Sequence, residues 1–537
     1  MSIASGACAA TLPRSSTSRA AGSTPAAFSN CETGVTPTGT NPTGNRAGVL
    51  SGSVGFASRA VVQLLLFGVT IVATRTLSID DFGAYAIGSL FLILARQLFY
   101  GGPYEYLLKS QDDGNLFSAC FGANLVQAAV LALLLGAVWL ATPLLFPAGK
   151  VSMILGLLVP AILPVAAVAW YEAVLLRAMR VKRYYASLLV GDTLGAALAV
   201  FLLLHGWGVV ALVAQTYARL ISVLVLLALA TGQRPSLAAR PRAIREVLHW
   251  SRARHVAVLL NFTSAYGADL VLGVALSPAA TGLYRASNRI VSALSDLFAQ
   301  PLQKIAQTNL SASCVRRQDS GTAWLTMLSG VGAVAWSGLL TLACLAPDLV
   351  PFALGAKWAP AVPIVVVFCA VKAFALLDAV TTSFLVCHDR QRAMLKVQAA
   401  SAVSVIGLAW FSARWGPQAV ALAVGLTTAA MSLTYAAMVM RQSRADRHAV
   451  RAVAWTSAPP VVAVGIGLAL FEACAPQLAA LPRITAGLAV AALSFFAGAF
   501  LVRHRILDAI GSLGHLPAPS AGPLPHPHEE PALCAKT

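Results

Sequence analysis

The chain has 537 residues, of which 58% are hydrophobic and only 11% are charged, and its formal net charge is +18. Soluble chains carry about a quarter charged residues, so this composition excludes a soluble globular protein and indicates a membrane protein. The positive charge does not indicate nucleic-acid binding, because the basic residues are divided among short loops, as orientation signals facing anionic lipid are.

Both ends of the chain are polar. Residues 1–47 are rich in Ser, Thr, Gly, Ala and Pro and have no apolar core, which predicts a disordered cytoplasmic tail and excludes a signal peptide. Residues 511–537 have a similar composition. They predict a second disordered cytoplasmic tail.

Between the tails lie fourteen apolar segments, each long enough, at about 20 residues, to cross a bilayer as a helix. They predict an all-α, polytopic membrane protein without a separate soluble domain. The segments are 51–75, 82–107, 116–142, 151–178, 184–205, 208–232, 247–276, 281–309, 322–345, 360–386, 394–413, 418–440, 453–474 and 482–502.

The distribution of Lys and Arg among the loops predicts the orientation of these helices. When the N-terminus is placed inside, every inner loop carries at least one basic residue, and most carry several. The outer loops and helix ends hold only Arg75, Lys150, Lys357, Arg414 and Arg483. This asymmetry predicts that both termini are cytoplasmic.

A short pattern occurs twice in the chain. Leu77-Ser78, Gly83, Tyr85 and Leu98-Phe99 recur as Leu276-Ser277, Gly282, Tyr284 and Leu297-Phe298, at an offset of 199 residues (276 − 77). Trp207-Gly208 and Ala211 recur as Trp415-Gly416 and Ala419, at an offset of 208 (415 − 207). Internal repeats of this kind build many transporters, with the substrate site between the two halves.

Segment eight carries the clearest polar pattern. A charge at the centre of a bilayer costs at least about 2.5–3.5 kcal/mol, so it needs a partner or water. The polar residues of this segment step by three, four or seven and form one helical stripe, which predicts a helix that faces a wet cavity or another polar helix. They are Arg285, Arg289, Ser292, Asp296, Gln300, Gln303 and Gln307.

Segments one, two and seven are polar as well. They contain Arg59, Gln63, Thr70 and Thr74; Tyr85, Ser89, Arg96 and Tyr100; and Asn261, Ser264 and Asp269. Arg59, Arg96 and Arg289 have no obvious carboxylate partner, which favours an anionic substrate, and the guanidinium fork suits phosphate. Other charges have alternative interpretations. Arg219 and Asp192 are expected to pair with each other, Lys372 and Asp378 with partners on their own or a neighbouring helix, and Arg285 with Asp296 or Asp269.

Catalytic and metal motifs do not occur in the sequence. The nine cysteines and nine histidines form neither CxxC nor HExxH, and the chain has no nucleotide-binding motif. We therefore expect no metal and no cofactor. Membrane polymerases and ligases tend to need a sizeable external loop, whereas the outer loops here are short. A transporter is therefore expected rather than an enzyme.

Two stretches resemble the Wzx-like polysaccharide exporters, which are lipid-linked oligosaccharide flippases of the multidrug/oligosaccharidyl-lipid/polysaccharide (MOP) superfamily. The first runs from Thr74 to Tyr85, and the second combines Asp269–Gly273 with Thr281–Tyr284. Gly355-Ala356-Lys357-Trp358 before a helix is similar to this family too. The resemblance spans roughly residues 50–505 and carries no catalytic signature.

The resemblance implies two six-helix lobes around a central cavity, at 48–232 and 247–440, with two further helices at 453–502. It also implies export of an undecaprenyl-diphosphate-linked oligosaccharide across the bacterial inner membrane, with membrane lipid and a polysaccharide polymerase or export machinery as partners. Related lipid II flippases place essential arginines on helices one, two and eight, where Arg59, Arg96 and Arg289 lie here. A lipid II flippase and a drug or cation antiporter of the same superfamily are the alternatives.

The expected site has three sets of residues. Diphosphate and sugar binding is assigned to Arg59, Arg96, Arg285 and Arg289. The cavity lining is assigned to Gln63, Tyr100, Asn261, Ser292 and Gln303, and a coupling ion to Asp269 and Asp296.

The predicted topology can be tested with cysteine or reporter tags. We expect tags at residues 147, 357 and 478 to be accessible from outside the cell, because they lie in loops with few basic residues. Tags at 237, 317 and 445 are expected to be accessible only from inside. A tag at 237 that reports outside would contradict the helix count in the first half of the chain.

Overall fold

The computed structural model describes residues 61–504, except 112–113, 147–148, 316–319, 444–446 and 475–478. Every regular element in this part of the chain is helical. Residues 51–537 form one compact unit, which contains all of the described residues.

All fourteen predicted segments contain helix where the structure describes them. Twelve helices in the described ranges are long and apolar enough to cross a membrane. The other two segments are one and eight. The described part of segment one, Val61–Thr76, is shorter, and segment eight lies in α10 (Pro278–Val315), which carries the polar stripe. The prediction of an all-α, polytopic membrane protein is confirmed.

We call the first group of helices the first bundle. It begins with helix Val61–Thr76 and continues with α2 (Ile79–Phe99), η1 (Tyr100–Tyr104), α3 (Glu105–Lys109), α4 (Leu116–Leu145), α5 (Lys150–Leu158), η2 (Val159–Ala161), α6 (Ile162–Arg177), α7 (Val181–Leu204) and α8 (Val210–Thr231). Helix Val61–Thr76 buries Val69 and Ala73 against α7 and α8. The inner side chains of α4, α6 and α8 form further apolar clusters.

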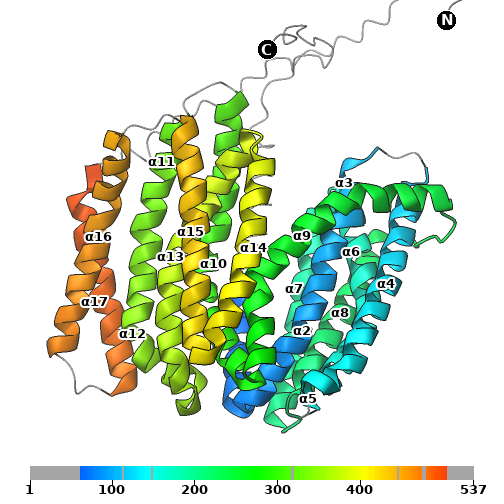
Figure 1. The fold of residues 1–537 in the computed structure, drawn as a ribbon, viewed down its shortest axis with the longest axis horizontal. Coiled ribbons are helices and arrows are strands. Elements are labelled where there is room, and N and C mark those ends of the chain that lie inside the picture. The colour runs from blue at the N-terminus through cyan, green and yellow to red at the C-terminus, as the bar shows by residue number, and fades with distance from the viewer. Residues whose placement is uncertain are drawn as a thin grey trace, which may run out of the picture. The chain divides into compact units, whose positions relative to one another are not determined.

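The second bundle begins with α10 and continues with α11 (Ser320–Val331), η3 (Gly332–Trp336), α12 (Ser337–Leu354), η4 (Ala356–Ala361), α13 (Val362–Cys387), α14 (Gln391–Ser412), η5 (Ala413–Trp415), α15 (Pro417–Ser443), α16 (Arg447–Cys474) and α17 (Ala480–Leu501). It surrounds α10 and α13, which share a large apolar cluster. The last two helices, α16 and α17, pack against each other and against α11 and α12 (Figure 1).

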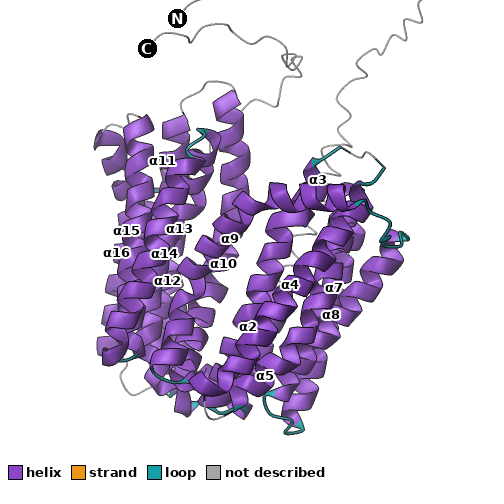
Figure 2. Ribbon diagram, turned by 45° about the vertical axis from the view of Figure 1, so that its right-hand side comes forward, coloured by secondary structure: helices purple, strands orange, loops and turns teal. Residues whose placement is uncertain are grey.

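Helix α9 (Pro241–Ala275) contacts both bundles. It packs on α2, η1 and α4 of the first bundle and on α10 and α14 of the second (Figure 2). The predicted lobe boundaries at 232 and 247 therefore stay a prediction, because the described chain forms a single compact unit.

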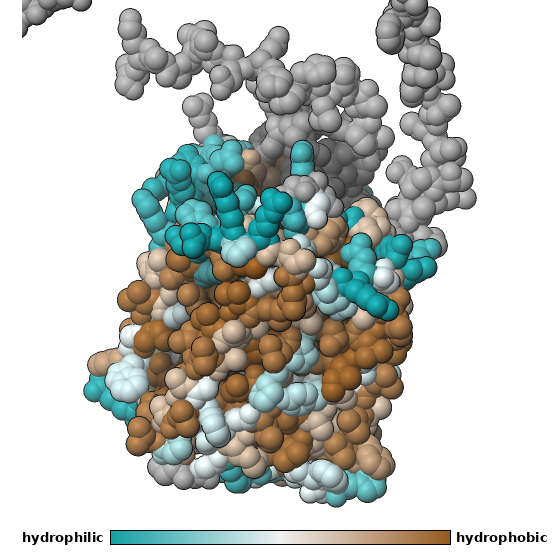
Figure 3. All heavy atoms as spheres, turned by 90° about the vertical axis from the view of Figure 1, so that its right-hand side faces the viewer, coloured by the Kyte–Doolittle hydropathy of each residue, from teal (hydrophilic) through white to brown (hydrophobic). Residues whose placement is uncertain are grey.

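The helices have two chemically different ends. We call the end with the loops at 178–180, 232–240 and 388–390 the basic end, and the end with the turns at 77–78, 276–277 and 355–361 the far end. On the face in Figure 3, apolar side chains form a broad band between polar ends, with more hydrophilic side chains at the basic end. Such a band is what contact with hydrocarbon requires.

The repeated sequence pattern forms the same structure twice at the far end. Ser78 precedes α2, and its hydroxyl accepts a hydrogen bond from the Asp81 amide at 3.0 Å. Ser277 precedes α10, and its hydroxyl accepts one from the Ala280 amide at 3.2 Å. Each repeated serine therefore satisfies an amide that the first turn of a helix leaves unpaired.

The two copies of the pattern also pack on each other, through their glycines. A Cβ atom on Gly83 would lie 1.8 Å from the Pro278 carbonyl oxygen, and one on Gly282 would lie 2.7 Å from the Ile79 carbonyl oxygen. Pro278 and Ile79 are themselves 199 residues apart (278 − 79), which is the repeat offset. Reciprocal contacts of this kind are what a two-fold relation between the copies produces.

This contact predicts the effect of a single methyl group. We expect Gly83→Ala to destabilise the protein by about 1–3 kcal/mol, because the new Cβ meets backbone atoms that cannot move independently of α10. Gly68→Ala is the matched control, since it also lies in a helix but has nothing within 4 Å of its Cβ position. Thermal unfolding of both purified variants is the measurement. Equal midpoints for the two variants would show that the close approach is unimportant.

Candidate functional site

A polar cavity of about 380 Å³ lies between the two bundles. Its walls come from helix Val61–Thr76, α2, α6, α7 and α8 of the first bundle, and from α10 of the second. The polar side chains that line it are Thr70, Tyr85, Ser89, Arg96, Asp192, Gln215, Thr216, Arg219, Arg285 and Arg289. The predicted central cavity therefore receives arginines from both bundles.

Two of the four arginines have carboxylate partners. Arg219 forms an ion pair with Asp192, which joins α8 to α7, as the sequence predicts. Arg285 forms one with Asp269 at 3.4 Å, and its guanidinium lies 4.7 Å from the centre of the Tyr266 ring. Asp269 is completely buried. These two pairs offset the cost of placing charges away from bulk water.

The other two arginines, Arg96 and Arg289, form no ion pair among the described residues. The Arg96 guanidinium lies over the Tyr100 ring, 5.2 Å from its centre. Four guanidinium groups and two carboxylates leave an excess of two positive charges (4 − 2) in the cavity and its ion pairs. A cavity with this excess is suited to an anion with two negative charges.

A second, smaller cavity of about 20 Å³ adjoins the first. Arg96 and Arg219 line both cavities. The smaller one also contains Tyr100 and Glu172, and Glu172 is only 1% exposed. The sequence analysis missed Glu172, although it is the only acidic residue in segment 151–178. That isolation within an apolar segment was the available signal.

The structure separates the other predicted lining residues. Gln63 lines an apolar groove on the other side of its helix. Asn261 accepts a hydrogen bond from the Gln398 amide at 2.9 Å, and the Ser292 hydroxyl donates one to Asn288 within α10. Gln303 is exposed. These residues were expected to share one cavity. Gln63 and Asn261 instead face other neighbours of their own helices, and α10 is long enough for Ser292 and Gln303 to meet different neighbours along its length.

Some predicted residues lie beyond what the structure describes. Arg59 falls outside the described residues, and so do the side chains of Gln300 and Gln307. The roles assigned to them stay predictions. Of the stripe on segment eight, the structure places Arg285 and Arg289 in the central cavity.

The remaining charges lie on α10 and α13. Lys372 and Asp378 form no ion pair with each other among the described residues, because they are six positions apart and face different sides of α13. Asp378 instead accepts a hydrogen bond from Ser432 at 2.9 Å. The charge of Lys372 acts on Asp296, as does that of Arg289.

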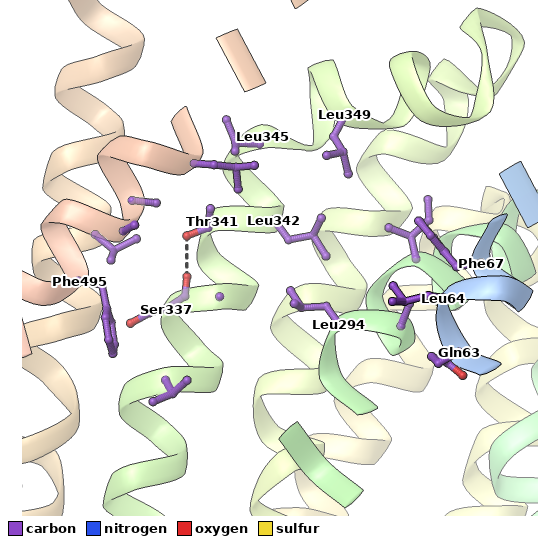
Figure 4. Close-up of a pocket in the computed structure, with 18 of the residues that line it drawn as sticks. Gln63, Leu64, Phe67, Leu294, Ser337, Thr341, Leu342, Leu345, Leu349 and Phe495 are labelled. Atoms are coloured by element: carbon purple, nitrogen blue, oxygen red, sulfur yellow. Dashed lines mark hydrogen bonds between the residues drawn. The ribbon is translucent and has the colours of Figure 1, made fainter. Parts of the chain in front are cut away.

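An apolar groove of about 550 Å³ lies beside the polar cavity. Helix Val61–Thr76 contributes Leu64 and Phe67 on one side, and α12 and α17 contribute Leu342 and Phe495 on the other (Figure 4). Its polar side chains are few: Gln63, Ser337 and Thr341, and the Thr341 hydroxyl donates to the Ser337 carbonyl at 2.8 Å. This groove is suited to a hydrocarbon chain.

Hydrogen bonds join the two bundles at the far end. The Lys357 ammonium donates to the carbonyl oxygens of Arg75 and Leu77 at 3.1 and 2.6 Å, and the Trp358 indole donates to that of Thr74 at 2.9 Å. These carbonyls lie at the C-terminus of helix Val61–Thr76, where helices favour cationic donors.

The first bundle also donates hydrogen bonds to the second. Arg75 donates from Nε to the Ala353 carbonyl at 3.1 Å and from Nη2 to the Phe352 carbonyl at 2.6 Å, at the C-terminus of α12. The Trp358 and Phe82 rings also pack edge to face, with 5.5 Å between the ring centres. Each bundle therefore caps a helix of the other. We call this set of contacts the far-end latch.

The chain belongs to a known family. The family model described as "Polysaccharide biosynthesis protein" matches residues 72–363, which is just over half of the chain. No curated protein sequence matches at a significant level. The predicted family resemblance is confirmed.

Solved structures share the fold. The chain is similar to the lipid II flippase MurJ in an inward closed conformation, with a TM-score of 0.69 and 12% identity over 84% of this chain and 99% of that chain. It is also similar to an inward-facing multidrug resistance MATE family transporter of the MOP superfamily, with a TM-score of 0.57 and 12% identity over 72% and 98%. The chain therefore shares the fold of these two structures.

The far-end latch predicts a shift in conformation when Lys357 is replaced. We expect Lys357→Met to raise the population with separated far ends about three- to ten-fold, because two charge-assisted hydrogen bonds, one exposed and one partly buried, are lost. Spin labels on cysteines at His205 and Arg414, one on each bundle, report the distance. Lys150→Met is the control, because its ion pair with Asp81 lies within the first bundle. Identical distance distributions for Lys357→Met and Lys150→Met would exclude the latch.

Proposed function

We propose that this protein moves an undecaprenyl-diphosphate-linked oligosaccharide across the bacterial inner membrane, for exopolysaccharide, capsule or O-antigen synthesis. The observation that carries the proposal is the arginine-lined cavity beside an apolar groove. The two sites share walls, because helix Val61–Thr76 and α10 each face both of them. A molecule with an anionic head and a hydrocarbon tail matches this pair of sites.

The charge of the cavity suits a diphosphate. A diphosphate that links a lipid to a sugar carries two negative charges near neutral pH, and the cavity has two guanidinium groups in excess. Arg96 from α2 and Arg289 from α10 approach from different bundles and form no ion pair in the described residues, so they are assigned to the diphosphate. Guanidinium groups donate two parallel hydrogen bonds to phosphate oxygens. Arg285 adjoins them, and Arg59 keeps this role as a prediction from sequence.

The apolar groove is suited to the hydrocarbon tail of the lipid carrier. On helix Val61–Thr76, Leu64 and Phe67 face the groove while Leu66 and Thr70 face the cavity. On α10, Ala293 and Leu294 face the groove and Arg289 faces the cavity. A lipid carrier is thus able to keep its chain on the apolar side while its diphosphate reaches the arginines. Long apolar chains remain in a hydrocarbon environment at no cost in hydrophobic free energy.

The mechanism we infer is alternating access. The basic end is placed in the cytoplasm with both termini, following the distribution of Lys and Arg. The far-end latch then closes the outer side, and loss of these contacts opens it as the bundles rock about the site. The chain acts as a transporter, not an enzyme. Asp269 and Asp296 are candidates for binding a coupling ion, and a polysaccharide polymerase or export complex is the proposed partner.

The alternatives make different demands on the cavity. An antiporter for cationic drugs needs an excess of carboxylates, whereas this cavity has an excess of guanidinium groups. A lipid II flippase has the same demand for a diphosphate site and an apolar groove. Membership in the family of polysaccharide biosynthesis proteins favours the polysaccharide substrate.

The test is binding of undecaprenyl diphosphate to the purified protein, together with polysaccharide export in cells. We expect Arg96→Ala and Arg289→Ala each to weaken binding about 10- to 100-fold, the loss that corresponds to roughly 1.5–3 kcal/mol for hydrogen bonds to a charged group. Lys at either position is expected to restore part of the affinity, because it keeps the charge and loses the fork.

Arg414→Ala is the control for this test. Its guanidinium lies at the far end, 4.0 Å from the centres of the Phe411 and Trp415 rings, away from the cavity. It is expected to bind the lipid as the wild type does. If Arg96→Ala and Arg289→Ala do so too, the diphosphate site is elsewhere.

A further inference from the structure

Glu172 occupies an unusual position within the first bundle. It lies on α6 and is 1% exposed. Its carboxylate accepts a hydrogen bond from the Tyr184 hydroxyl at 3.4 Å, and it forms no ion pair among the described residues. A buried carboxylate with so few partners is costly, so its protonation is sensitive to the charges around it.

Two positive charges act on Glu172, those of Arg96 and Arg219. Arg219 is already bound to Asp192, which leaves Arg96 as the uncommitted counter-charge. The other titratable groups that face this carboxylate are tyrosines of the neighbouring helices, namely Tyr100, Tyr104 and Tyr184. Tyrosine hydroxyls are neutral near pH 7, so the charge at this place is set by the arginines and by Glu172 itself.

The small cavity connects Glu172 to the substrate site. Arg96 lines this cavity and the large one, as do Val165, Arg219 and Leu220. At about 20 Å³ the small cavity is large enough for one water molecule. The Tyr100 side chain lines the small cavity beside Glu172. Arg96 therefore stands between two anionic positions, the Glu172 carboxylate on one side and the proposed diphosphate on the other.

Charge balance distinguishes the two states of Glu172. With a dianionic diphosphate bound, four arginines, Asp192 and Asp269 sum to zero if Glu172 is neutral (4 − 2 − 2), and to −1 if it is ionised. Without substrate, an ionised Glu172 reduces the excess of two positive charges to one. The empty site thus favours the carboxylate and the filled site favours the carboxylic acid, because an uncompensated buried charge costs several kcal/mol.

We propose that Glu172 is a proton-binding site coupled to the substrate: it binds a proton when the diphosphate engages Arg96, and releases the proton when the diphosphate leaves. This inference rests on the proposed function. The proton adds to a carboxylate oxygen and comes from solvent, so no bond in the substrate is broken. By linkage, a proton taken up on binding makes the affinity for the diphosphate rise as the pH falls, by up to ten-fold per pH unit.

The experiment measures proton uptake by isothermal titration calorimetry on the full-length protein in lipid nanodiscs. Undecaprenyl diphosphate is the probe, and each titration is repeated in buffers of different ionisation enthalpy. We expect the wild type to take up about one proton more per bound lipid than Glu172→Gln, at a pH where Glu172 titrates. Protonation of the probe itself is common to both proteins and cancels. Glu172→Gln is expected to bind at least as tightly, because the amide is neutral.

Glu105→Gln is the matched control. Glu105 lies on the adjacent α3 but is partly exposed and forms ion pairs with Lys109 and Arg254. Its substitution is expected to leave the extra proton in place. A second measurement needs no variant: infrared difference spectra of the wild type should gain the C=O stretch of a protonated carboxyl group on adding the probe.

The outcomes separate this inference from the proposed function. Equal proton uptake by the wild type and Glu172→Gln, or no new carboxyl band in the wild type, overturns the role of Glu172 while the probe still binds. No binding of the probe to the wild type overturns the proposed function and this inference with it. An extra proton that is lost in Glu172→Gln and retained in Glu105→Gln supports the coupling.

Discussion

The contact between Gly83 and Gly282 is the constraint on which the arrangement of the bundles depends. Two helix N-termini meet there without a side chain between them, so α2 and α10 approach as closely as backbones can. Three of the cavity arginines are positioned relative to this crossing, because α2 carries Arg96 and α10 carries Arg285 and Arg289. The far-end latch adds hydrogen bonds at the same end, and the cavity extends from there between the bundles.

A second constraint is the cost of charge away from water. The protein neutralises two of the four cavity arginines with Asp192 and Asp269 and leaves two without ion pairs in the described residues. Such a site is electrostatically incomplete without an anion. The excess of positive charge in the cavity is therefore suited to an anion, and the adjoining groove, with few polar side chains, is suited to an apolar chain.

Local reasoning from the sequence predicted the charges but only part of their pairing. The ion pair of Asp192 with Arg219 links neighbouring helices that a short turn connects, so proximity in sequence sufficed. Lys372 and Asp378 lie on different faces of one helix and find other neighbours. Glu172 was missed because its importance depends on its proximity to Arg96, a residue of another helix far away in the sequence.

The sequence by itself determined that the chain lies in a bilayer and where its helices run, because only apolar helices about 20 residues long cross the hydrocarbon. It also determined the repeat, because the repeated serine is needed to cap a helix and the repeated glycine allows two helices to pack closely. Only the tertiary structure decided which polar faces share a cavity. Gln63 and Leu66 are three residues apart on one helix, yet one faces the apolar groove and the other the arginines. That difference depends on which helices stand opposite, and helix packing between distant segments decides it.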